Sequence, residues 1–162
     1  MKDILAELMG EWCTGVNIGG IILKICLAIV LSAVIGSERA TKRHAAGLRT
    51  FMLVSLVSAL AATVDKFLIT EYGVSIPVVT GATVIGLAIV SSNTILYSSK
   101  SQIKGLTTSV ALWGNSILSV LIGLDLYLIA LVAFAAFMLC LTGFMRFEYC
   151  LLYTSDAADD KA

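Results

Sequence analysis

The sequence predicts an all-α membrane protein, a polytopic bundle of about five transmembrane helices. Hydrophobic residues make up 59% of its 162 residues and charged residues only 14%, whereas soluble proteins have about 45–50% and about 25%. The mean hydropathy is +0.97, and long apolar runs alternate with short polar segments. A water-soluble fold of this length would need more polar side chains to cover itself, so we expect the lipid bilayer to be the solvent.

Five apolar runs are each long enough to cross a bilayer, which takes about 20 residues. A charged segment follows the first run at 37–47, Pro77 opens the third, and a polar segment follows the third at 98–104. The break at 123–125 is so short that the last two runs form either a tight antiparallel hairpin or one kinked helix. The helices expected from these runs cover residues 17–36, 48–69, 75–97, 105–124 and 126–146.

Basic residues gather in two of the connections, and acidic residues in the others. The connections after the first and third helices contain Arg39, Lys42, Arg43, Arg49, Lys100 and Lys104. The N-terminal segment and the remaining connections contain Asp3, Glu7, Glu11, Asp65, Glu71 and Asp125. The positive-inside rule then predicts a multi-pass protein with its N-terminus outside and its C-terminus in the cytoplasm. The formal net charge of zero suggests no nucleic-acid partner.

The domain organisation is simple. We expect one transmembrane domain over residues 1–149, followed by a disordered or non-native tail over 150–162. The cysteines fit small hydrophobic residues of helices, and His44 fits a surface loop. The sequence contains no Walker loop, no H-E-x-x-H and no G-x-S-x-G, so we expect neither an enzyme nor a cofactor.

Small residues repeat every four positions on three of the expected helices, a spacing that marks faces turned toward other helices in lipid. These stripes are either packing grooves alone or in part the lining of a site. The functional alternative rests on Lys24, Glu38 and Asn115. The stripes are Lys24, Ala28, Ser32 and Gly36; Ser55, Ala59 and Thr63; and Thr107, Ala111, Asn115, Ser119 and Gly123.

Lys24 and Glu38 are the charged candidates of the first helix. A charge at the centre of a transmembrane helix costs about 2.5–3.5 kcal/mol. Lys24 therefore either extends toward the membrane surface or points inward, toward water or a carboxylate. Glu38 is either paired with Arg39, Arg43 or Arg49 or solvated in a loop at the membrane surface.

Two blocks of sequence resemble the signature of the MgtC/SapB family. The first is I-G-S-E-R at 35–39 with A-G-L-R-T at 46–50 and L-V at 53–54; the second is K-G-L-T-T at 104–108 with A-L-W at 111–113. The order and separation of the blocks also fit, and the resemblance covers about residues 20–146. By motif, it singles out Gly36, Glu38, Arg39, Gly47, Arg49, Thr50, Gly105, Thr107, Thr108 and Trp113.

The resemblance implies a bacterial inner-membrane protein of about five helices, connected with adaptation to low magnesium, acid stress and virulence. It further implies a regulator of other membrane complexes, in some members the proton-driven ATP synthase. A homo-oligomer is a further possible assembly. The glycine-rich third helix of the family corresponds to 86–93 here, where only Gly86 is kept, so hydrogen bonds from Ser91, Ser92 and Asn93 could replace close helix contact.

Both blocks fall where a cytoplasmic loop re-enters the membrane. Threonines there can cap helix N-termini, and Lys42, Arg49 and Lys104 would form a positive patch for an anionic lipid or an acidic partner. The alternative is ordinary positive-inside orientation without a partner.

Two functions compete: a non-enzymatic membrane regulator, and a transporter or channel for Mg²⁺ or another ion. A Mg²⁺ path usually offers carboxylate and water ligands. The acidic residues near the expected helices, Glu38, Asp65 and Asp125, all lie near helix ends, which favours the regulator.

Overall fold

The structure, a computed structural model, describes residues 17–42, 44, 46–97 and 103–143. The predictions for the N-terminal acids, Arg43, Lys100, residues 144–146 and the tail at 150–162 lie outside these residues. Within them, the chain forms the helices α2 (Ile18–Thr41), α3 (Leu48–Tyr72), α4 (Val78–Ser92), α5 (Leu106–Gly123) and α6 (Tyr127–Met138), and α6 continues as a π-helical turn, η1 (Leu139–Gly143). The predicted all-α bundle of about five helices is confirmed.

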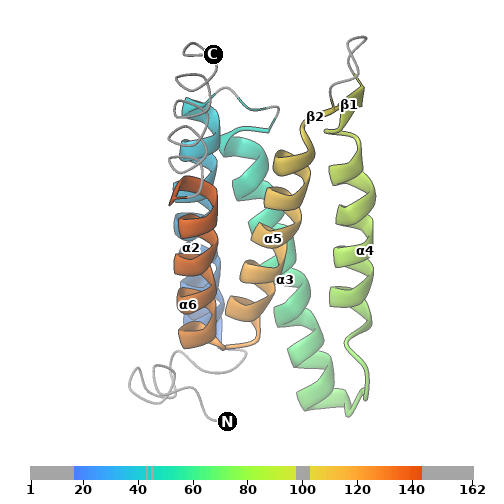
Figure 1. Ribbon diagram of the computed structural model, residues 1–162. Helices are drawn as coiled ribbons and strands as arrows, with labels where there is room; N and C mark the ends of the chain where they lie inside the picture. Colours follow the sequence, from blue (N-terminus) through green and yellow to red (C-terminus); the bar gives the residue numbers. More distant parts are fainter. Residues whose placement is uncertain (1–16, 43, 45, 98–102, 144–162) are drawn as a thin grey trace, which may run out of the picture.

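The helices run alternately up and down, with α3 and α5 near the centre and α4 at one edge (Figure 1). We call the end that contains the C-terminus of α2 and the N-termini of α3 and α5 the Arg39 end. The other end, with the turn between α5 and α6, is the Asp125 end. That turn spans only Leu124 to Leu126, so of the two alternatives for the last two runs, the tight hairpin is correct.

The interior is made of small and mildly polar residues, while large apolar side chains point outward. Each stripe residue of α2 and α3 is buried, and on α5 only Thr107, at the first turn, is exposed. In contrast, Ile22 is 56% exposed, Leu53 62% and Ile85 66%. This inverted distribution is the one that helices packed in lipid adopt. The predicted packing faces are therefore confirmed, except at Thr107.

Three helices, α2, α3 and α5, are long and apolar enough to cross a membrane by length and composition. Helix α2 extends to Thr41, five residues beyond the predicted end at 36. Its backbone keeps its hydrogen bonds through this segment, with Lys42 N–H donating to Glu38 O. Glu38 and Arg39 therefore belong to the last turns of the helix and not to a loop.

Helix α4 is shorter than the predicted 75–97. Its N-cap is Pro77, and a residue that precedes proline is disfavoured in the α conformation. At the other end, Thr94 Oγ1 donates to Ser91 O, a local bond that competes with the helical pattern. The 15 residues of α4 span about 22 Å, less than the bilayer core of about 30 Å.

A β-hairpin whose two strands have two residues each lies between α4 and α5. It was not predicted. Strand β1 (Leu96–Tyr97) pairs antiparallel with β2 (Ile103–Lys104). Gly105 follows with φ +92°, and a Cβ there would lie only 2.0 Å from Thr94 O. This conformation and this close approach require glycine, which gives Gly105 of the second motif block a structural role.

Only Ser91 of α4 is buried. Asp65 of α3 attaches the first turn of α4, because its carboxylate accepts hydrogen bonds from Val79 N at 3.1 Å and Thr80 N at 2.5 Å. The proposed interhelical bonds from Ser91 and Ser92 are wrong, since both hydroxyls donate to carbonyls of α4 itself, Ala88 O and Ile89 O. A Cβ at Gly86 would meet nothing within 4 Å, so close contact at this glycine is indeed absent.

Candidate functional site

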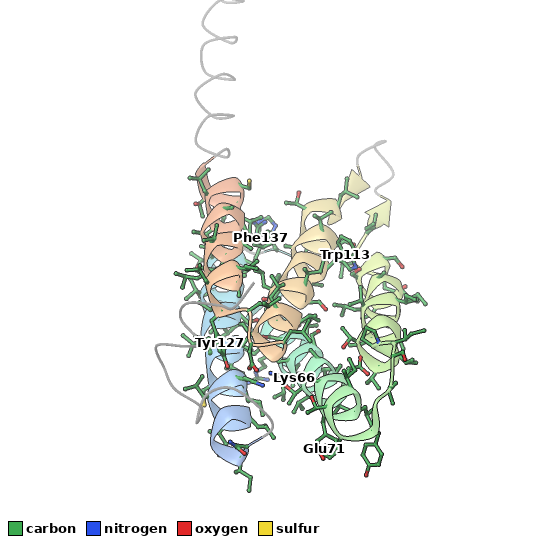
Figure 2. All side chains as sticks on the ribbon, turned by 90° about the horizontal axis from the view of Figure 1, so that it is seen from below. Lys66, Glu71, Trp113, Tyr127 and Phe137 are labelled. Carbon is green, nitrogen blue, oxygen red and sulfur yellow. The ribbon has the colours of Figure 1, made fainter. Side chains whose placement is uncertain are left out.

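A carboxylate in the turn between α5 and α6 connects three parts of the bundle. Asp125 Oδ1 lies 2.7 Å from Lys24 Nζ of α2, and Asp125 Oδ2 pairs with Lys66 Nζ of α3. Tyr127 Oη, at the start of α6, donates to Asp125 Oδ1 at 3.1 Å. Figure 2 labels Lys66 and Tyr127 close to one another. We call Lys24, Lys66, Asp125 and Tyr127 the Asp125 cluster.

The Asp125 cluster is buried and well paired. The side chain of Lys24 is 0% exposed, that of Asp125 8% and that of Lys66 28%. Asp125 has φ +63°, a left-handed conformation that is uncommon outside glycine but that Asp tolerates better than most residues. Buried charges persist only when paired and hydrogen-bonded, and both Asp125 oxygens have such partners. Lys24 therefore points inward, to a carboxylate, which was one of its two predicted alternatives.

Between the two ends, polar side chains of α3 and α5 bond to one another. Ser55 pairs with Ser119 and Ser58 with Ser116, each at 2.7 Å. Asn115 Nδ2 donates to Phe51 O at 3.1 Å, and Ser55 Oγ also contacts Ala28 O of α2 at 2.8 Å. We call these four serines and Asn115 the serine ladder. Each of these five side chains therefore has a hydrogen-bond partner inside the bundle.

A second charged group lies at the Arg39 end. Arg39 Nε is 2.8 Å and Lys42 Nζ 2.5 Å from the Glu38 carboxylate, so two cations share one carboxylate. Arg39 Nη1 donates to His44 Nε2 at 3.3 Å, since a guanidinium has no acceptor. We call Glu38, Arg39, Lys42 and His44 the Arg39 cluster. Glu38 is thus ion-paired, and its partners are Arg39 and Lys42.

The Arg39 cluster is less well satisfied than the Asp125 cluster. Arg39 is 1% exposed, yet Arg39 Nη2 has no hydrogen-bond partner among the residues that the structure describes. Arg39 Nε and both Glu38 oxygens are close enough for an ion pair but are not aligned for a hydrogen bond. Burial lowers the pKa of His44 from its ordinary value, and the charge of Arg39 lowers it further, which favours the neutral imidazole that accepts from Arg39 Nη1.

The profile of the MgtC family matches residues 25–150, which is most of the chain. The chain belongs to the MgtC family. Both motif blocks lie inside the matched region, as does the whole of the Arg39 cluster, while Lys24 immediately precedes it.

Two relatives illustrate the range of the family. "Putative magnesium transporter YhiD" of Escherichia coli is 29% identical over 112 residues, 65% of this chain and 52% of the relative. "Protein SrpB" of Synechococcus elongatus is 29% identical over 136 residues, 76% of this chain and 70% of the relative. The chain therefore spans about half the length of the YhiD protein that it matches. No solved structure matches the chain.

The family blocks divide into buried and exposed residues. Thr108 and Asn115 are each 1% exposed and Gly36 is buried, whereas Trp113 is 42% exposed. The remaining exposed candidates are Arg49, Thr50 and Thr107. The N-caps of α3 and α5 are Gly47 and Gly105, and neither helix has a side-chain cap, so the expected threonine caps are wrong.

Gly36 explains how the first block packs. A Cβ at Gly36 would lie 2.9 Å from Leu48 Cα and 3.1 Å from Phe51 Cβ, so α2 and the first turn of α3 touch there through backbone. At Gly47 the nearest atom to an added Cβ is Ala40 Cβ at 3.9 Å, which is ordinary contact. Gly36 is thus required by packing, and Gly47 is not.

Sequence analysis missed Lys66 and Tyr127. Lys66 follows Asp65 near the end of an apolar helix and resembles a surface charge in sequence. One signal was available: Lys24 in the first helix needed a carboxylate, and Asp125 was one of few acids near a helix end. That reasoning could have found the Lys24 pair but not the second lysine.

Proposed function

We propose that this chain is a non-enzymatic inner-membrane protein that regulates another membrane protein by binding it, with its Arg39 end in the cytoplasm. Membership of the MgtC family supports a membrane role. The orientation is supported by Arg39, Lys42 and Arg49, which lie together at one end of the bundle, as the positive-inside rule expects of a cytoplasmic surface.

The observation that carries the proposal is the hydrogen bonding of the serine ladder inside the bundle. The serines of the serine ladder bond in pairs between α3 and α5, so they do not present their oxygens to a passing ion. A cation crossing the bundle would also pass Lys24 Nζ, which is buried and held at 2.7 Å from Asp125. An ammonium at that depth repels a divalent cation, and Mg²⁺ prefers oxygen ligands. The interior is therefore better suited to holding the helices together than to conducting an ion.

The exposed part of the motif blocks supplies a contact surface. Arg49 and Thr50 lie in the first turn of α3 and Thr107 in the first turn of α5, all at the Arg39 end, and Trp113 lies further along α5. Aromatic and arginine side chains contribute most to protein interfaces. The family resemblance makes the ATP synthase the first complex to test as the partner.

The alternative function is Mg²⁺ transport, which the printed name of the E. coli relative favours. Flux through liposomes that contain the purified chain separates the two functions. We expect Mg²⁺ entry, followed with an enclosed Mg²⁺-sensitive dye, to equal that of empty liposomes. Selective Mg²⁺ flux that Glu38→Gln abolishes would instead establish transport.

Partner binding is tested in cells by cross-linking followed by purification of the chain. We expect one membrane complex to co-purify and to be lost with Arg49→Ala or Trp113→Ala. Glu71→Gln is the matched control, because Glu71 is exposed at the Asp125 end (Figure 2). Loss of the complex in all three variants, or in none, contradicts binding through the motif blocks.

A further inference from the structure

We propose that Arg39 binds a phosphate group, from an anionic lipid headgroup or from free phosphate, at the Arg39 end of the bundle. This inference concerns a small-ligand site and stands apart from partner binding. Three features of this end support it: the buried donor Nη2 of Arg39, the net positive charge around it, and the N-terminus of α3.

Arg39 has donors that the described protein atoms leave unused. A guanidinium has five N–H groups. Nη1 contacts His44 at 3.3 Å, Nε is beside Glu38, and Nη2 has no partner although the side chain is 1% exposed. A buried donor without an acceptor is costly, and in native structures such a donor is usually met by an ordered water, an ion or a ligand. The missing acceptor must be compatible with a cation.

The local charge also favours an anion. Arg39 and Lys42 share the single carboxylate of Glu38, so these three side chains carry one excess positive charge. His44 Nε2 accepts from Arg39 Nη1, and burial and the charges of Arg39 and Lys42 lower the pKa of His44 while Glu38 raises it, which favours an uncharged imidazole. The carboxylate of Glu38 is engaged by Lys42 Nζ at 2.5 Å, which reduces its repulsion of an incoming anion.

The start of α3 supplies a second set of donors close by. Gly36, one helical turn before Arg39, lies against Leu48, the first residue of α3. No side chain caps that N-terminus, and the first N–H groups of a helix attract anions. A phosphate has enough oxygens to accept from both a guanidinium and a helix N-terminus, and arginine matches phosphate geometry better than lysine. The site lies at the end of the bundle, where lipid headgroups are expected.

The test uses the purified full chain in a sugar-based detergent that contains no phosphate. Short-chain phosphatidylglycerol is titrated in one series and inorganic phosphate in another, both at constant ionic strength, while the unfolding temperature Tm is measured. A ligand of the folded state raises Tm. We expect a saturable rise with phosphatidylglycerol, and Arg39→Gln to weaken the apparent affinity about tenfold or more. If inorganic phosphate also gives a saturable rise in Tm, free phosphate is a sufficient ligand.

Arg49→Gln is the matched control, because Arg49 is an exposed arginine at the same end and the variant loses the same charge. We expect it to weaken the affinity much less than Arg39→Gln does, because an exposed arginine of the positive patch attracts the anion only through a screened field. Arg39→Lys is the second variant in case Arg39→Gln does not fold; it keeps the charge, and we expect it to lose several-fold in affinity because the guanidinium fork is gone. The proposal is overturned if neither ligand gives a saturable rise, or if the Arg39 and Arg49 variants lose equal affinity, since that indicates a diffuse positive surface.

Discussion

The Asp125 and Arg39 clusters use similar residues with different results. Around Asp125, two lysines and a tyrosine from three helices surround one carboxylate, and both oxygens are engaged. Around Arg39, all members come from α2 and the residues just after it, and no described residue is a hydrogen-bond partner of Arg39 Nη2. A charge cluster built across helices stabilises their packing, whereas one built within a helix end leaves donors available to a ligand.

The largest expected effect tests the Asp125 cluster as a structural connection. Asp125→Asn removes the charge that Lys24 and Lys66 share, and breaking a buried ion pair costs about 3–5 kcal/mol. The free energy of unfolding, measured by denaturant titration in detergent micelles, should fall by this amount. Glu71→Gln removes a negative charge from an exposed residue near the same end, and should change the free energy by less than about 0.5 kcal/mol. Equal effects of the two substitutions would count against a special role for Asp125.

Packing at the Arg39 end is tested by Gly36→Ala. The added Cβ would lie 2.9 Å from backbone at Leu48, so the helices must separate, at a cost of about 1–3 kcal/mol. At Gly86 an added Cβ meets nothing within 4 Å, and Gly86→Ala should leave stability unchanged or raise it by about 0.5–1 kcal/mol. Thermal unfolding of both variants in the same detergent gives the comparison, and a Gly36→Ala protein as stable as the native one contradicts the close contact.

The serine ladder between the two clusters should contribute moderately. Ser55→Ala removes the contacts to Ser119 and to Ala28 O and should lower the free energy of unfolding by about 1 kcal/mol. A double-mutant cycle with Ser119→Ala measures the shared part. Strict additivity of the two substitutions would mean that these hydroxyls do not interact.

The stabilities of the Arg39→Met and Lys24→Met variants compare the two clusters directly. Arg39→Met removes a donor, Nη2, that has no acceptor among the described residues, but it also removes the contacts of Nε with Glu38 and of Nη1 with His44. Because Glu38 keeps Lys42 as a partner, we expect the stability of the ligand-free protein to fall by only about 1 kcal/mol. Lys24→Met, at a fully paired position, should cost about 3 kcal/mol. Denaturant titration of both variants decides whether they differ in this order.

The smallest expected effect is the pH dependence that His44 causes. Burial and Arg39 lower the pKa of His44 in the folded state, so the unfolded chain binds more protons just below the ordinary pKa of about 6.5. Stability due to this residue should therefore fall slightly as the pH drops from about 7 to about 5.5. His44→Gln should remove that part of the slope in Tm against pH, and an unchanged slope contradicts it.

The sequence was sufficient for the parts of the fold that depend on composition and periodicity. Helix number and the buried faces of α2 and α3 follow from apolar runs and from the four-residue spacing of small residues. The end of α2 did not follow, because Glu38 to Thr41 look like a polar loop until their helical hydrogen bonds are seen. The hairpin after α4 was missed for a similar reason, since two-residue strands have no pattern of their own.

The candidate site was only half accessible from sequence. A lysine in an apolar helix demands a partner, and this reasoning placed Lys24 correctly among its alternatives. The convergence of Lys24, Lys66 and Tyr127 on Asp125 joins residues 59 positions apart in the case of Lys66. It depends on which helices are neighbours, and that information is tertiary. The donor left over on Arg39 likewise appears only once the partners of its other nitrogens are known.

The most direct test compares Lys24→Met and Arg39→Gln in one experiment, with Tm measured in the presence and absence of phosphatidylglycerol. The account predicts that Lys24→Met lowers Tm without the lipid but keeps the lipid-induced rise. It predicts that Arg39→Gln lowers the Tm of the lipid-free protein less than Lys24→Met does and loses the lipid-induced rise. If both variants change both quantities alike, the two clusters do not have separate roles.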